Sequence, residues 1–358
     1  MFVWVQFSLC LCLIGIAGVK LTRYGDAIAD KTGLGRTWVG VLLLAAVTSL
    51  PEFATGISSV TVADVPDIAV GDILGSCVFN LLILASLDVI NRRESVYRQA
   101  SQGHILSAGF GVILLGVIGL GIVLSGVESP AAFGHVGYYS PLLILLYFIA
   151  MRTVFHYEKK RVGDFTDQEP DRYPQITLRQ TVLRYLAAAA VVVGAGIWLP
   201  FVGATLAAQM GWNESFVGTL FVAVVTSAPE MVVTVAAVRL GALDMAVGNV
   251  LGSNLFNTVI IAVDDLFYVN GPLLSFVDSN HVVSAFTAIM MTGKEVFKVA
   301  VQTLGNVASE TLEKAGLAAG AVGVVCSLDL KADEAAVHAL AAHLETHLDV
   351  EGLLAAAR

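Results

Sequence analysis

Nine long apolar runs constrain the fold of this chain more than any other feature of its sequence. A transmembrane helix needs about 20 consecutive, mainly apolar residues, and each run approaches or exceeds that length. Only 14% of the 358 residues are charged, against about 25% in soluble domains, which excludes an ordinary soluble enzyme. We therefore predict an all-α membrane protein with spans near residues 2–21, 37–62, 66–90, 104–125, 138–156, 178–202, 213–238, 243–266 and 273–291.

The basic residues divide the connections between these runs into two sets. All 20 Lys and Arg residues lie in, or next to, the connections that follow the first, third, fifth, seventh and ninth runs, and the alternate connections contain none. By the positive-inside rule, the N-terminus faces the outside of a plasma (inner) membrane that the chain crosses many times. The first run has no basic residue before it, so it is interpreted as a span and not as a signal peptide. The acidic excess, 29 Asp and Glu against 20 Lys and Arg, argues against a nucleic-acid partner.

Two segments of the first half recur in the second half. Residues 40–52 align with residues 218–230 at an offset of 178, and both copies end in Thr-Ser-x-Pro-Glu. Residues 69–80 align with residues 246–257 at an offset of 177, and both copies contain Gly-x-x-x-Gly-Ser. Five spans, an odd number, separate the copies, so the second copy must be inverted in the membrane. Inverted repeats are typical of secondary transporters, whose substrate site lies near the midplane.

The repeat also predicts the domain organisation. Residues 1–156 form a first repeat of five helices, and residues 178–291 form a second repeat, apparently of four. Residues 157–177 are the longest polar stretch between two spans and contain mixed charges and two prolines. Such a composition indicates a solvated, cytoplasmic linker between the halves.

Each copy of the first motif places a glutamate in the middle of a span. An ionised carboxylate in hydrocarbon is costly without a partner, and no Lys or Arg lies at the depth of Glu52 or Glu230. The compensating charge is therefore a bound cation or a proton. The prolines before the glutamates cannot donate to the carbonyls of Val47 and Val225, and carbonyl, hydroxyl and carboxylate oxygens suit Ca²⁺ and Na⁺. Hydroxyls are available from Thr48, Ser49, Thr226 and Ser227.

The second motif adds polar side chains beside small residues. Asp72 and Asn249 occupy equivalent positions, each inside a Gly-x-x-x-Gly segment that allows close helix approach. We therefore expect both side chains to lie near the glutamates. An alternative is that the neutral polar side chains only join helices by hydrogen bonds. The further oxygen donors are Ser76, Ser253, Asn80, Asn254 and Asn257.

The two motifs and their second-half copies resemble the α-repeats of the cation/calcium exchanger superfamily, the sodium/calcium exchangers. The resemblance covers residues 1–291 and implies ten helices in two inverted halves of five. It implies Ca²⁺ antiport driven by Na⁺ or H⁺ in a lipid bilayer by a functional monomer, with no enzymatic activity and no cofactor. One departure is Cys77, which stands where the second copy has Asn254, because a thiol is a poor ligand for hard cations. The implied roles are central ligands for Glu52 and Glu230, flanking ligands for Asp72 and Asn249, oxygen ligands for Thr48 and Thr226, and support of sodium sites for Ser49, Ser76, Ser227 and Ser253.

Charge neutrality connects these residues to exchange. One Ca²⁺ or several Na⁺ can offset the three carboxylates of Glu52, Asp72 and Glu230, but not both at once. We therefore predict Na⁺-driven Ca²⁺ antiport by alternating access. The alternatives are an antiporter of H⁺ and Ca²⁺ or another divalent cation, a cation channel, and a cation sensor that does not transport. A membrane-anchored acyl-transfer enzyme is disfavoured, because Cys326 has no His and Asn partners in the expected pattern.

Residues 292–358 differ in character from the rest of the chain. Their charges interrupt every apolar run of span length, so we predict an atypical, cytoplasmic tail in place of a tenth helix. Residues 291–317 resemble a fragment of β-ketoacyl-carrier-protein synthase III, but no His-Gln-Ala-Asn follows, and no activity is implied. The end of the tail has the pattern of a short strand and an amphipathic helix. We interpret the tail as fused or composite.

Overall fold

The computed structural model describes residues 2–32, 45–90, 102–125, 132–162, 173–239 and 243–294. The chain divides into two compact units, residues 1–297 and residues 298–358, and every described residue belongs to the first. The expectations for the tail beyond residue 294 lie outside the described residues, including the missing tenth span, the synthase-like fragment and the terminal strand and helix. So do linker residues 163–172.

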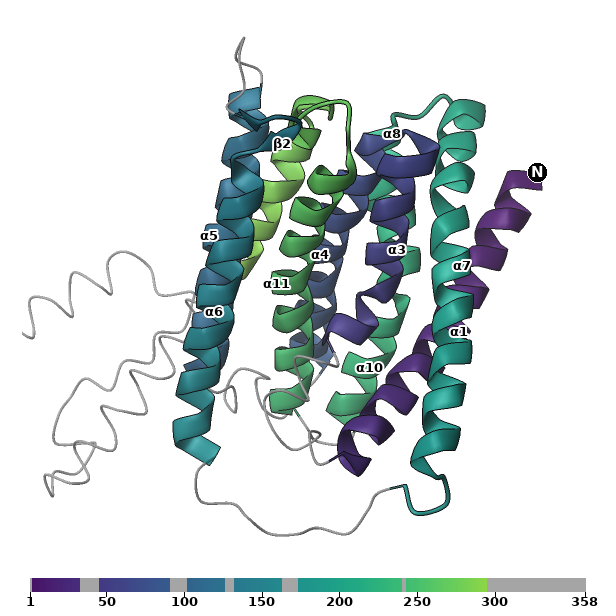
Figure 1. The fold of residues 1–358 in the computed structure, drawn as a ribbon, viewed down its shortest axis with the longest axis vertical. Coiled ribbons are helices and arrows are strands. Elements are labelled where there is room, and N and C mark those ends of the chain that lie inside the picture. The colour runs from purple at the N-terminus through teal and green to yellow at the C-terminus, as the bar shows by residue number, and fades with distance from the viewer. Residues whose placement is uncertain are drawn as a thin grey trace, which may run out of the picture. The chain divides into compact units, whose positions relative to one another are not determined.

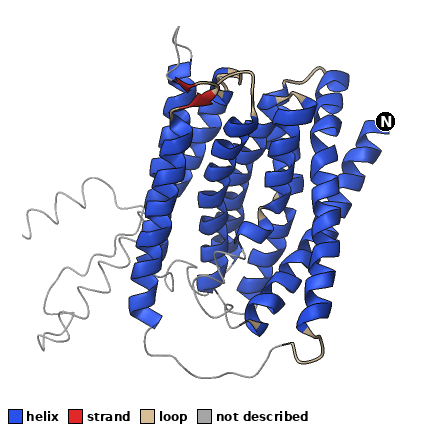
Figure 2. Cartoon of the chain, in the orientation of Figure 1, coloured by secondary structure: helices blue, strands red, loops and turns tan. Residues whose placement is uncertain are grey.

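The described part of the chain is almost entirely helical (Figures 1 and 2). In it, six helices are long and apolar enough to cross a membrane, and a pair of helices bent by 49° makes up to a seventh. These helices fall on predicted spans, and they confirm the all-α membrane fold. The six are α1 (Phe2–Lys31), α4 (Pro66–Ile90), α5 (Gln102–Ser125), α6 (Tyr139–Val162), α7 (Leu178–Met210) and α11 (Leu243–Phe267).

The spans that contain the Pro-Glu motif are interrupted in both halves. The first is described from residue 45, where residues 45–48 are helical and a turn at Ser49 follows. Interrupted helices at matching positions are the pattern expected of a transporter site, and π-helical turns often occur at functional sites. The pieces are α3 (Leu50–Ser58) and the π-helix η1 (Ser59–Ala63) in the first half, and α8 (Glu214–Phe216), the π-helix η3 (Val217–Val222), α9 (Ala223–Thr226) and α10 (Ala228–Arg239) in the second.

The last predicted span begins later than expected. A helix covers residues 281–294, whereas a short 3₁₀ turn, η4 (Leu273–Ser275), occupies the start of the predicted run at 273–291. Gly271 has a φ of 147° and Pro272 follows it, so the chain cannot continue as a helix there. The apolar side chains of Leu273 and Leu274 are buried inside the protein, which explains why they looked like part of a span.

The helices α3, α4, α10 and α11 lie together, flanked by α1 and α7 on one side and by α5 and α6 on the other (Figure 1). Most of α4 and α11 is buried, whereas most of α1 and α6 is not. The second polar motif of each half therefore lies in one of the two most buried of these six spans. A two-stranded hairpin, β1 (Ala132–Phe133) and β2 (Val136–Gly137), joins α5 to α6 and was not predicted.

Candidate cation site

Both glutamates lie in the first turn of a helix that starts at the interruption. Glu52 follows the turn at Ser49, and Glu230 follows the turn at Ser227. The two turn residues have nearly the same backbone, with φ and ψ of −84° and 12° at Ser49 and −81° and 6° at Ser227. A helix N-terminus favours negative charge, so this local structure stabilises a carboxylate at each position.

The prolines shape these turns as the sequence predicts, with one difference. Pro51 and Pro229 have no N–H, so the carbonyls of Val47 and Val225 have no helical donor. The carbonyl of Val225 instead receives the N–H of Ser227, which also donates to the Ala223 carbonyl at 3.0 Å. At the second turn, the carbonyl oxygen that the proline leaves without a helical donor is therefore partly satisfied by the N–H of Ser227.

Serines of each half donate to the glutamate of the other half. Ser227 Oγ donates to Glu52 Oε1 at 3.1 Å, and Ser49 Oγ donates to Glu230 Oε1 at 3.2 Å. A second donor, Ser76 Oγ of α4, lies 3.3 Å from Glu52 Oε1. The bonds at 49 and 227 are reciprocal, as expected where two copies of one motif face each other.

The hydroxyls continue this reciprocal pattern between the two motifs. Thr48 Oγ1 lies 3.2 Å from Ser253 Oγ, and Thr226 Oγ1 lies 3.4 Å from Ser76 Oγ. In each pair, a threonine beside the interruption contacts the serine that follows the Gly-x-x-x-Gly segment of the other half. These threonines and serines are among the predicted site residues, and the structure brings them together.

The carboxylates keep free oxygens although they are fully buried. Glu52 and Glu230 have 0% exposed area, and within the described residues Oε2 of each has no hydrogen-bond partner. Asp72 is equally buried; its Oδ1 accepts from Thr226 Oγ1 at 2.7 Å, and its Oδ2 has no partner in that part of the chain. A buried ionised oxygen without a partner is costly, and a bound cation removes that cost.

Asn249 differs from Asp72, its counterpart in the repeat, in its hydrogen-bond partner. Its Nδ2 donates to Thr234 Oγ1 at 3.1 Å, one helical turn beyond Glu230 on α10. Gly56 occupies the position equivalent to Thr234 at the offset of 178, so Asp72 has no such partner in its own half. Asn249 Oδ1 remains buried, without a partner among the described residues.

Carboxylates alone do not make up a metal site in the described part of the chain. Among the described residues, no group of three or more His, Cys, Asp and Glu side chains could hold a metal ion. A cation here needs hydroxyl, amide or carbonyl oxygens as well, which the reciprocal pairs supply.

Small residues allow the backbones around the site to approach closely. A Cβ at Gly75 would lie 2.2 Å from the Thr219 carbonyl oxygen, and a Cβ at Gly71 would lie 3.0 Å from the Thr219 nitrogen. The predicted close approach of α4 to the second-half motif is thus present. The same holds on the outer side of the motif, where a Cβ at Gly18 of α1 would meet Pro229, and a Cβ at Gly196 of α7 would meet Ala54. Gly18 and Gly196 are also 178 residues apart, which is the offset between the two copies of the first motif.

Amides link the two halves beside Cys77. Asn80 Nδ2 donates to Asn254 Oδ1 at 3.0 Å, and Asn254 Nδ2 donates to the Cys77 carbonyl at 3.2 Å. The first half has no amide side chain at position 77, and there the side-chain amide of Asn254, from the second half, forms a hydrogen bond with the backbone. Asn257 is fully buried, and neither atom of its amide has a hydrogen-bond partner in the described part. It was named only as a further oxygen donor, and its free amide makes it a candidate ligand.

Sequence reasoning missed Asp264 of α11. Its side chain is fully buried, and neither carboxylate oxygen has a hydrogen-bond partner among the described residues. A Cβ at Gly56 of α3 would lie 2.4 Å from Asp264 Oδ2, so the carboxylate lies directly against the backbone one turn beyond Glu52. The signal was weak, because Asp264 lies only two residues before the end of the predicted span 243–266, whereas Glu52 and Glu230 lie in the middle of theirs.

Comparisons with known proteins agree with this geometry. The family described as "Sodium/calcium exchanger protein" matches residues 2–156 and 180–294. The chain is 25% identical over 252 residues to the inner membrane protein YrbG of Escherichia coli K12, covering 70% of this chain and 75% of that protein. It is 27% identical over 275 residues to the sodium/calcium exchanger MaX1 of Methanosarcina acetivorans, covering 69% and 77%.

Solved structures share the fold. The crystal structure of an H⁺/Ca²⁺ exchanger, CAX, superposes with a TM-score of 0.60 at 13% identity, covering 84% of this chain and 82% of that one. A structure of the sodium-calcium exchanger NCX_Mj gives a TM-score of 0.52 at 17% identity, covering 86% and 98%. The family match shows an integral, multi-pass cation/Ca²⁺ antiporter, which is a transporter and not an enzyme and whose ions are substrates and not cofactors. Because the family matches well over half of its residues, this chain belongs to the sodium/calcium exchanger protein family.

Proposed function

We propose that this protein exchanges Ca²⁺ for Na⁺ by alternating access, with Glu52 and Glu230 as ligands that both ions use. The observation that supports this most is the state of the two glutamates. Both are fully buried, each keeps one oxygen without a partner, and neither has an ion pair with a basic side chain among the described residues. Buried carboxylates of this kind in a membrane need a cation.

The surrounding oxygens define two classes of proposed ligand. Charged oxygens come from the glutamates and Asp72, and neutral oxygens come from the hydroxyls that link the two halves and from the free Oδ1 of Asn249. Ca²⁺ takes six to eight oxygens with several carboxylates among them. We propose that the remaining hydroxyls complete this shell or serve Na⁺, and the hydroxyl residues are Thr48, Ser49, Ser76, Thr226, Ser227 and Ser253.

Exchange follows if the two ions share the carboxylates. One Ca²⁺ and several Na⁺ carry comparable charge, so either can neutralise the site, but both together would overcharge it. Each ion can then bind only when the other has left, and this mutual exclusion couples the fluxes. The turns at Ser49 and Ser227 support this proposal, because each serine donates to the glutamate of the other motif copy.

The orientation and assembly belong to the same proposal. We propose an inner-membrane protein with the N-terminus outside, acting as a monomer, with repeats over residues 1–156 and 178–291. The distribution of Lys and Arg supports this topology. In the structure, α6 continues to Val162 and α7 begins at Leu178, so a linker between the halves would be shorter than residues 157–177. Residues 292–358 are proposed as a cytoplasmic tail.

Ion-swap transport in proteoliposomes tests the function. Vesicles containing the full chain are loaded with Na⁺ and diluted into radioactive Ca²⁺, and parallel vesicles carry an H⁺ gradient or a K⁺ gradient instead. We expect Ca²⁺ uptake with the outward Na⁺ gradient only. Uptake with the H⁺ gradient alone would assign H⁺ as the coupling ion and overturn the proposal for Na⁺. Uptake that needs no counter-ion gradient would indicate a channel.

A further inference from the structure

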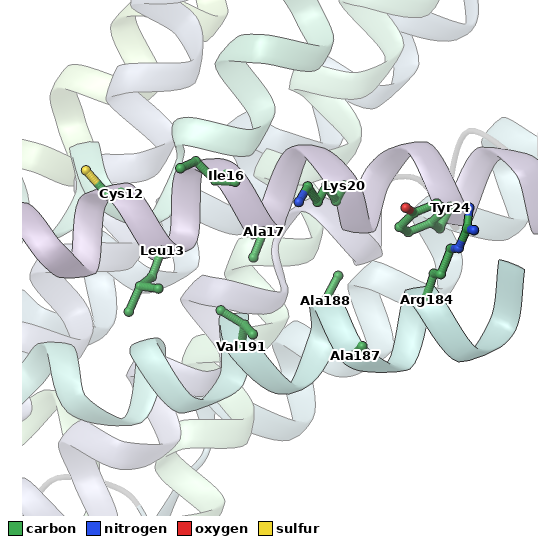
Figure 3. A pocket seen from close by; sticks show the side chains of 10 residues that line it. All are labelled: Cys12, Leu13, Ile16, Ala17, Lys20, Tyr24, Arg184, Ala187, Ala188 and Val191. Atoms are coloured by element: carbon green, nitrogen blue, oxygen red, sulfur yellow. The ribbon is translucent and has the colours of Figure 1, made fainter. Parts of the chain in front are cut away.

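A groove of about 410 Å³ lies between α1 and α7, and none of its lining residues is a residue of the candidate cation site. Its walls come from both helices, and its two ends differ in character (Figure 3). One end is lined by the apolar side chains of Leu13, Ile16 and Val191. The other end is lined by Lys20, Tyr24 and Arg184. An apolar channel that ends in two cations is suited to an amphiphile with an anionic head.

The groove opens onto the surface that faces the bilayer. Ile16 is 62% exposed and Val191 is 41% exposed, so neither is covered by another part of the described chain. Between them the floor of the groove is closed by small side chains, Ala17 and Ala188, both of which are buried. The apolar end is therefore a shallow channel between two packed helices, with apolar walls that suit a hydrocarbon chain.

The two cations at the other end have no acidic partner. Lys20 and Arg184 are both exposed, and neither has an ion pair with a carboxylate within the part of the chain that the structure describes. They come from different helices and line the same groove. Two like charges repel each other, and an anion bound between them attracts both and offsets that repulsion.

The basic end lies at the depth of the lipid headgroups. Lys20 is 18 residues beyond the first residue of α1, and a rise of about 1.5 Å per residue separates the two by roughly 27 Å. The hydrocarbon core of a bilayer is about 30 Å thick. If the start of α1 lies at one boundary of this core, Lys20 lies at the other, where basic side chains contact lipid phosphates.

We propose that this groove binds one anionic phospholipid. The phosphate lies between Lys20 and Arg184, and one acyl chain follows Leu13, Ile16 and Val191 along the groove. A zwitterionic lipid fits the apolar part equally well, but its quaternary ammonium group adds a third cation beside the two basic residues. The site therefore prefers a lipid with net negative charge. Gly18 of α1 packs on Pro229, so the lipid binds beside the helix pair that contacts the Pro-Glu turns.

Native mass spectrometry of the full chain in detergent tests the proposal. The protein is mixed with palmitoyl-oleoyl phosphatidylglycerol or with the phosphatidylcholine that has the same chains. We expect one phosphatidylglycerol to be retained in preference to phosphatidylcholine. In the double variant K20Q/R184Q, retention of phosphatidylglycerol should fall about 10- to 30-fold, because each basic residue contributes about 1 kcal/mol to binding of anionic lipid.

Matched variants separate this site from a general loss of charge or of folding. Arg23→Gln removes an exposed cation from α1 that does not line the groove, and it should leave retention unchanged. The variant K20R/R184K preserves both charges and should retain phosphatidylglycerol as the wild type does. Val191→Trp fills the apolar end and should reduce the retention of both lipids.

Three results would overturn the proposal. One is equal retention of phosphatidylglycerol by the wild type and by K20Q/R184Q. Another is equal retention of the two lipids by the wild type. The third is displacement of the bound lipid by excess inorganic phosphate in the wild type, which would indicate a site for a soluble anion. All of these readouts are independent of ion transport, so they stand or fall separately from the proposed exchange.

Discussion

Two clusters of buried polar side chains in this molecule differ in how completely their hydrogen bonds are made. In the central cluster, Glu52, Glu230 and Asp72 each keep one oxygen without a partner among the described residues. At the C-terminal end of α11, the carboxylate of Asp265 accepts four hydrogen bonds, from Gly137 N, Tyr139 Oη, Ser140 Oγ and Leu273 N, at 2.5–2.9 Å.

The difference separates a carboxylate that holds the fold from one that is available to an ion. Protein donors occupy both oxygens of Asp265, so it anchors the hairpin of the first half and η4 of the second to the end of α11. The glutamates are held by one oxygen and keep the other free. By this criterion Asp264, which has no partner for either oxygen in the described part, belongs with the glutamates although it is the chain neighbour of Asp265.

The largest expected effect comes from removing the charge of a glutamate. Glu52→Gln and Glu230→Gln keep the size of the side chain but remove the charge that a cation neutralises. Loss of one partner of a buried charge pair costs about 3–5 kcal/mol, so Ca²⁺ exchange in proteoliposomes should fall at least about 100-fold. Glu214→Gln, on α8 and outside the network, serves as the control. Near-normal exchange in both site variants would remove the glutamates from the proposed site.

The two adjacent aspartates of α11 should respond in opposite ways. Asp265→Ala leaves four donors without their acceptor, and we expect a loss of about 3 kcal/mol or more in the free energy of unfolding. Asp264→Asn removes a buried charge that makes no hydrogen bond with the described residues, so stability should stay the same or rise. Thermal unfolding in detergent measures both. A larger loss for the Asp264 variant would break the distinction between the two clusters.

The close packing behind the site can be tested with one methyl group. In Gly75→Ala the new Cβ would lie 2.2 Å from a backbone oxygen that cannot rotate away, so we expect destabilisation of about 1–3 kcal/mol. Gly116→Ala, on α5, is the matched change in open space, with no atom within 4 Å of its Cβ. It should stabilise its helix by about 0.5–1 kcal/mol. Equal midpoints of thermal unfolding for the two variants would contradict the packing described for α4.

The smallest difference between two paired variants is expected for the two reciprocal serines. Ser49→Ala removes the serine that donates to Glu230, whereas Ser227→Ala leaves Glu52 with a second donor, Ser76. A hydrogen bond to a charged group is worth about 1.5–3 kcal/mol. We therefore expect both variants to need more Ca²⁺ for half-maximal exchange, with Ser49→Ala showing the larger shift. A larger shift in Ser227→Ala would mean that Ser76 does not compensate.

Sequence reasoning reached most of the fold and the centre of the site because both depend on local patterns. Apolar length predicts where spans run, and duplicated Pro-Glu segments predict two facing interruptions, so the pairing of Ser49 with Glu230 follows from the inversion. Asp264 and Asp265 show the limit of this reasoning. They are adjacent and chemically identical. Only the packing of the hairpin and of η4 against the end of α11 determines which of the two carboxylates has all its oxygens hydrogen-bonded. The late start of the helix at residue 281 has the same origin, since Leu273 is fixed by a contact with Asp265.

The Asp265 anchor also has a consequence for the order of biogenesis. Gly137 and Asp265 are 128 residues apart in sequence. At a synthesis rate of about 5–20 residues per second, Asp265, which accepts the hydrogen bond from the hairpin between α5 and α6, is synthesised roughly 6 to 26 seconds after Gly137. The first half therefore enters the membrane before the hairpin has its hydrogen-bond acceptor, and the hairpin becomes anchored only when α11 is inserted. A chain that stops before α11 should leave the hairpin accessible to proteases, although every helix of the first half is present.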